Sequence, residues 1–96
     1  MPVLACAEVD EIEIGWGNRP DGIFLFSEQS QLDEFKQKLE NGRKEHPQEF
    51  STVGNVRSAK VSDAIAQEVE ESGGSKWILQ HRYRDYKKSG EIKVFK

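Results

Sequence analysis

The sequence has little of what anchors or cross-links many small proteins. Its 96 residues include one cysteine, one methionine, two histidines and three prolines, and 35% of them are hydrophobic. A single cysteine excludes an intramolecular disulfide and favours a reducing compartment. No apolar run approaches the roughly 18 residues that a membrane-spanning helix needs. We therefore expect a cytoplasmic protein that does not associate with membranes.

Residue sets that bind metals or carry catalysis are also missing. A structural zinc site needs about four Cys or His ligands at close spacing, and Cys6, His46 and His81 lie far apart in the chain. The glycines near Pro20 do not form a phosphate loop, because a strand pattern rather than a helix follows them. Cys6 lies in an apolar stretch, as buried and inert thiols do. We expect no metal, no cofactor and no catalytic activity.

The charge is unevenly distributed along what the length predicts to be a single domain, residues 1–96. Residues 1–50 hold eleven acidic and five basic residues, whereas residues 51–96 hold six acidic and nine basic ones. The net charge of −3 therefore combines an acidic half with a basic half. Ordinary solvated faces are one interpretation of this pattern, and two binding surfaces of opposite sign are the other.

The first 26 residues predict a β-hairpin. Apolar residues alternate from residue 11 to 16, as in a half-buried strand. The alternation changes phase near Asp10, which indicates either a bulge or a break between two strands. Residues 18–22 contain Pro, Asp and Gly and form the strongest turn signal in the chain. The apolar run 23–26 predicts a second strand, buried on both faces.

Two helices are predicted in the middle of the chain. The first begins after a possible cap at Ser27, and it ends at Asn41-Gly42, or at His46-Pro47 if it continues. Residues 48–60 predict a short strand or an ordered loop. Ser62 is the expected N-cap of a second, short helix that ends at Gly73-Gly74.

Residues 77–86 and 91–95 predict a second hairpin, joined by a turn at 87–90. The expected order is ββ-α-(β)-α-ββ, an α+β fold with an antiparallel sheet and two helices packed on one face of it.

A protein-binding module without chemistry is our first functional hypothesis. It is a small acidic adaptor, regulator or inhibitor, in a size class common among accessory proteins of phages and mobile elements. The acidic strand would meet a basic surface on another protein. Trp16 is either part of the core, which the alternation favours, or a rigid aromatic anchor for the partner. The candidate contact residues are Glu8, Asp10, Glu11, Glu13, Trp16 and Arg19.

Single-stranded nucleic-acid binding through residues 76–96 is the alternative hypothesis. If residues 77–86 form a strand, Arg82, Arg84 and Tyr86 share one of its faces. Such a face could follow a phosphate backbone and stack a base. The acidic pI of about 5.4 argues against it. The candidate residues are Arg82, Arg84, Tyr86, Lys87 and Lys88.

Two further alternatives remain open. A small nuclease-like enzyme would use His81 as the general acid/base, with Arg82 or Arg84 holding a phosphate. Self-association into a homo-oligomer would pair the acidic surface of one copy with the basic surface of another, and salt would weaken it.

Overall fold

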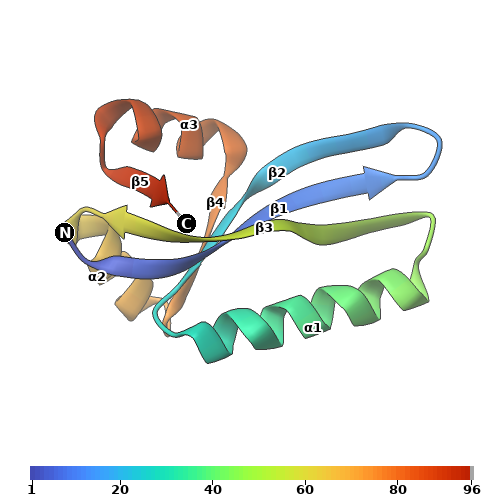
Figure 1. The fold of residues 1–96 in the computed structure, drawn as a ribbon, viewed down its shortest axis with the longest axis horizontal. Coiled ribbons are helices and arrows are strands. Elements are labelled where there is room, and N and C mark those ends of the chain that lie inside the picture. The colour runs from blue at the N-terminus through green and yellow to red at the C-terminus, as the bar shows by residue number, and fades with distance from the viewer. Residues whose placement is uncertain (96) are drawn as a thin grey trace.

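The computed structural model describes residues 1–95, and Lys96, the last residue of the predicted basic segment, lies outside them. Five strands form one antiparallel sheet in the order β4-β2-β1-β3-β5 (Figure 1). The predicted α+β class, antiparallel sheet and order of elements are confirmed. The elements are β1 (Val3–Glu13), β2 (Gly17–Phe26), α1 (Gln29–Glu45), β3 (Glu49–Val61), α2 (Asp63–Glu71), β4 (Ser75–Leu79), α3 (Gln80–Ser89) and β5 (Ile92–Phe95).

The predicted β1–β2 hairpin exists, but its turn lies at residues 14–16 rather than 18–22. The Pro-Asp-Gly sequence is instead part of β2. There the register passes from the pair Val9 and Gly22 to the pair Asp10 and Pro20, so that Asp21 is an extra residue in the ladder. Asp and Gly serve a bulge as well as a turn, which is why the composition alone was misleading.

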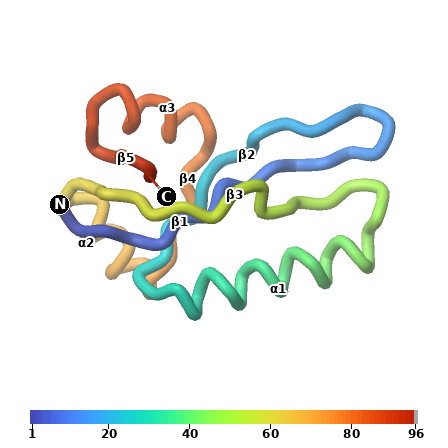
Figure 2. Tube along the Cα trace, in the orientation of Figure 1, coloured from blue at the N-terminus to red at the C-terminus, as the bar shows by residue number. Residues whose placement is uncertain are grey.

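The phase change near Asp10 is not a break in β1, and it coincides with bulges on the two neighbouring strands. Strand β1 is continuous, and the extra residues lie on its two neighbours, Asp21 on β2 and Gly54 on β3. Bulges increase the local twist of a sheet. Beyond the bulges, the outer half of the β1–β2 hairpin extends past the part of the sheet with which β4 and β5 pair (Figure 2).

Helices cover both faces of the sheet, which corrects the expectation that they share one. On one face, Cys6 lies in a buried cluster with Ile65 and Val69 of α2 and Tyr83 of α3. On the other face, Ala7 packs with Phe26 and with Leu32 of α1. The run 23–26 is apolar in both phases, so both of its faces need cover. Figure 1 shows α1 and α3 on opposite sides of the central strands.

In the middle of the chain, the structure agrees closely with the elements predicted from the sequence. Helix α1 runs past Gly42 and ends before Pro47, the later of the two predicted stops. Its N-cap is Glu28, which forms a capping box with Gln31, rather than Ser27. Strand β3 is one 13-residue strand, which decides between the strand and the loop predicted there.

Helix α2 confirms the predicted N-cap and the predicted short length. It has nine residues, and the Ser62 side chain accepts a hydrogen bond from the backbone N–H of Ile65.

The predicted second hairpin is wrong. After five residues of β4 the chain turns into α3, a ten-residue helix, and β4 and β5 then lie at opposite edges of the sheet. Gly90 adopts the left-handed conformation that ends the helix, with φ of 83°. The Lys87-Lys88-Ser89-Gly90 sequence is therefore a helix C-terminus and not a hairpin turn.

Candidate functional site

The tip of the β1–β2 hairpin exposes a tryptophan. Trp16 is flanked by Gly15 and Gly17, whose φ angles of 92° and 104° are ones that L side chains rarely adopt. Trp16 is 84% exposed and Ile14 is 56% exposed. Core packing of Trp16, which the alternation favoured, is therefore wrong. The signal missed in the sequence is the pair of glycines, which lets the chain reverse direction around Trp16.

Backbone hydrogen bonds hold this turn in place. The N–H of Trp16 donates to the carbonyl of Glu13 over 2.9 Å, and the N–H of Ile14 donates to the carbonyl of Gln48 over 2.9 Å. The second bond ties the turn to the chain just before β3. The backbone that carries the exposed apolar side chains is thus tethered, so that less backbone entropy would be lost on binding than for a free loop.

Carboxylates surround the tip. Arg19 Nη2 lies 3.2 Å from Glu11 Oε2 in an ion pair at the surface. Glu13 lies directly opposite Glu49 of β3 in the strand register, a pairing of like charges. Glu49 was not among the residues predicted from the sequence. A shallow depression of about 250 Å³ is lined by Glu11, Glu13, Trp16, Gly17, Asn18 and Arg19.

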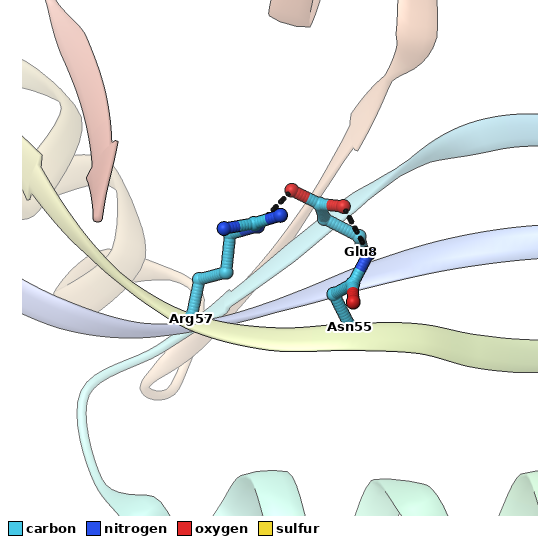
Figure 3. A network of polar contacts seen from close by, with 3 residues as sticks. All are labelled: Glu8, Asn55 and Arg57. Carbon is cyan, nitrogen blue, oxygen red and sulfur yellow. Dashed lines mark hydrogen bonds and ion pairs between the residues drawn. The ribbon is translucent and has the colours of Figure 1, made fainter. Parts of the chain in front are cut away.

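Glu8 and Asp10 do not belong to this surface. Side chains alternate along β1, so these two point to the opposite face of the sheet from Glu11 and Glu13. Glu8 Oε1 accepts a hydrogen bond from Arg57 Nε over 2.7 Å, and Glu8 Oε2 accepts one from Asn55 Nδ2 over 3.1 Å (Figure 3). Of the six residues predicted to contact a protein, four therefore lie together at the tip, and Glu8 and Asp10 lie elsewhere.

A second depression, of about 140 Å³, brings residues of opposite charge together between the sheet and α3. Glu8 and Asp10, predicted to contact a protein, line it together with Lys87, predicted to contact nucleic acid. Lys87 Nζ lies 4.3 Å from the centroid of the Tyr83 ring, a cation–π contact. Part of the acidic set and part of the basic set thus face each other within the molecule.

The other predicted nucleic-acid contacts lie on a helix and not on one face of a strand. Arg82 Nη2 donates a hydrogen bond to Tyr86 Oη over 2.8 Å, four residues along α3. Arg84 and Lys88 are exposed and also four residues apart. The predicted arrangement with Arg82, Arg84 and Tyr86 on one side of a strand is therefore wrong, because helical geometry separates Arg84 from the other two.

Two groups, Cys6 and Tyr83, have raised pKa values, and burial is the main cause in both. Burial raises the pKa of Cys6 to about 12, with the Glu8 charge adding to the rise and the Arg57 charge opposing it. Burial also raises the pKa of the Tyr83 hydroxyl to about 12. The expectation of a buried thiol at Cys6 is confirmed, and both groups are neutral at physiological pH.

Within residues 1–95, no group of three or more His, Cys, Asp and Glu side chains is arranged to hold a metal ion. No helix in that range is both long and apolar enough to cross a membrane.

Comparison with protein-family models, with curated proteins and with solved structures finds no match to this chain.

Proposed function

We propose that this protein is a non-catalytic protein-binding module, an adaptor, regulator or inhibitor, and that the hairpin tip is its contact surface. The observation that carries the proposal is the 84% exposure of Trp16 on a turn tied to its neighbours by backbone hydrogen bonds. Tryptophan is among the residues most often responsible for binding energy at protein interfaces. Ile14 beside it extends the apolar contact.

The charges around the tip favour a partner with a basic surface. Glu13 and Glu49 lie directly opposite each other across the β1–β3 ladder, where repulsion between like charges disfavours strand pairing. A lysine or arginine of a partner beside these two carboxylates would remove that repulsion. Opposite charges would also speed the encounter of the two proteins. The proposal includes a cytoplasmic location, with which the free, buried Cys6 is compatible.

Affinity capture from native lysate, treated with nuclease, tests the proposal. The matched variants are Trp16→Ala at the tip and Phe95→Ala, which removes an exposed aromatic residue on β5. We expect the wild type and Phe95→Ala to retain the same discrete protein and Trp16→Ala to lose it. With the purified partner, calorimetry should give a loss of about 30-fold or more in affinity for Trp16→Ala, as for other interface hot spots.

Charge reversal tests the basic partner. Glu11→Lys with Glu13→Lys should abolish capture, whereas Glu70→Lys with Glu71→Lys, which changes the net charge equally on α2, should not. A partner that is retained equally by Trp16→Ala and by the Glu11/Glu13 variant would show that the tip is not the contact surface.

A further inference from the structure

Helix α3 concentrates exposed positive charge. Its ten residues carry Arg82, Arg84, Lys87 and Lys88, all exposed, and only one acidic side chain, Asp85. None of these four bases takes part in the three ion pairs found among residues 1–95. The two lysines in the last turn favour the helix itself through its dipole, but the two arginines precede that turn.

The helix arranges part of this charge in an outward row. His81, Arg84 and Lys88 are three and four residues apart, so they line up along one side of α3. Tyr83, the buried residue of α3, lies on another side, where it packs into the core cluster. At a rise of about 1.5 Å per residue, the Cα atoms of Arg84 and Lys88 are about 6 Å apart along the axis. The row stands on a regular helix, and its three side chains are exposed.

The aromatic side chains of α3 are not available to stack on bases. Tyr83 is buried, with the Lys87 ammonium over its ring. Tyr86 is half-buried, and its hydroxyl and ring are both contacted by Arg82. Binding of single strands relies on such stacking, whereas binding of a duplex can rely on phosphate contacts from an exposed helix.

We propose that α3 binds the phosphate backbone of double-stranded nucleic acid, chiefly through Arg84 and Lys88. This inference goes beyond the proposed function, because α3 and the hairpin tip are separate surfaces. It also replaces the single-stranded mode expected from a strand. Arginine and lysine both form charge-assisted hydrogen bonds with phosphate oxygens. The protein's net charge of −3 opposes the approach of a polyanion, so we expect weak, salt-sensitive binding.

Fluorescence anisotropy with a labelled duplex of about 20 base pairs tests this, in potassium chloride from about 20 to 150 mM. We expect a wild-type dissociation constant between about 1 and 100 µM at low salt, which is weaker than usual because that range is typical of non-specific binding at physiological salt. Arg84→Gln with Lys88→Gln should weaken binding about tenfold or more. It should also reduce the slope of log K against log salt by about 2, because each lost phosphate contact contributes about 0.9.

The control variant is Lys36→Gln with Lys38→Gln, which changes the net charge equally on α1. It should bind the duplex as the wild type does, and circular dichroism should show that both variants are folded. The proposal is overturned if the wild type shows no binding at low salt, if both variants lose affinity equally, or if the matching single strand binds as tightly as the duplex. Trp16→Ala should leave duplex binding unchanged, so failure at α3 is distinguishable from failure at the tip.

Discussion

At position 22, the close approach of two strands requires a glycine. It lies on β2 opposite Leu79 of β4, and a Cβ atom built on it would run into the carbonyl oxygen of Ile78 and the ring of Trp77. The backbones of β2 and β4 can approach this closely only because Gly22 has no side chain. This requirement comes from a contact about 55 residues away in the sequence, and not from a local turn.

We therefore predict that Gly22→Ala destabilises the protein by about 2 kcal/mol or more, because backbone atoms would have to move. Gly42→Ala is the control, since Gly42 lies inside α1 with open space around it. That change should stabilise the protein by about 0.5 to 1 kcal/mol. Urea unfolding of the three proteins measures both effects, and equal changes for the two variants would contradict the assignment.

Cys6 gives a second prediction at the scale of the residue. Its folded-state pKa of about 12 lies above the value of about 8.5 expected for an unfolded chain. The unfolded state therefore releases the thiol proton first as pH rises, which favours unfolding. The stability due to the neutral thiol should be complete below about pH 8.5 and should fall by about 1.4 kcal/mol per pH unit up to about pH 12.

Urea unfolding at about pH 8, 9 and 10 measures this decline, and Cys6→Ala should lose most of it over that range. The Tyr83 hydroxyl, with its pKa also raised to about 12, adds a second decline only above about pH 10. An identical pH dependence in the wild type and in Cys6→Ala would contradict the shift at Cys6.

At the scale of the element, one cross-strand pair of the β1–β3 ladder is unfavourable for stability. The strands end with Glu13 directly opposite Glu49, although a neutral or opposite pair would stabilise the same ladder. In contrast, Glu8 and Arg57 pair across the same two strands at 2.7 Å, with side chains 27% and 30% exposed. The like-charged pair lies at the tip, and the compensated pair lies in the middle of the sheet.

We predict that Glu13→Gln and Glu49→Gln each stabilise the isolated protein by a few tenths of a kcal/mol, up to about 1. The double variant should gain little more than either single variant, because the repulsion is removed only once. Thermal or urea unfolding at low salt measures this cycle, and about 1 M salt should reduce the gain. Strictly additive effects would show that the two carboxylates do not interact.

At the scale of the whole molecule, the fold separates the two candidate surfaces. The protein is 39 Å long, and the hairpin tip lies at the end far from the N-terminus (Figure 1). Gly22 lines the depression beside α3, and the tip begins at Gly17, five residues along the same strand. At about 3.3 Å per residue this is a separation of about 17 Å. The two proposed contact surfaces are therefore about 17 Å or more apart along β2.

We accordingly predict that effects at the two surfaces are independent. Combining Trp16→Ala with Arg84→Gln and Lys88→Gln should change partner affinity and duplex affinity only as the separate variants do, within about 0.5 kcal/mol. Calorimetry with the protein partner and anisotropy with the duplex measure the two affinities. If the Arg84 and Lys88 changes weaken the protein partner as much as Trp16→Ala does, the surfaces are not separate.

The sequence by itself determined the features that depend on near neighbours. The α+β class, the first hairpin, the Ser62 cap and the burial of Cys6 followed from periodicity and capping residues that act over a few positions. The acidic first half of the chain and the basic C-terminal segment followed from composition alone.

Only the tertiary structure decided the features that depend on distant contacts. Residues 77–86 are predicted as one strand, yet the strand stops at Leu79 and residues 80–89 form a helix, with Tyr83 packed in the core and Gly90 as the C-cap. Trp16 continues the alternation of a buried face, yet it is exposed, because no helix or neighbouring strand within residues 1–95 covers the turn at 14–16. Local periodicity gives the spacing of side chains but not what covers them, and burial is decided by which elements pack together.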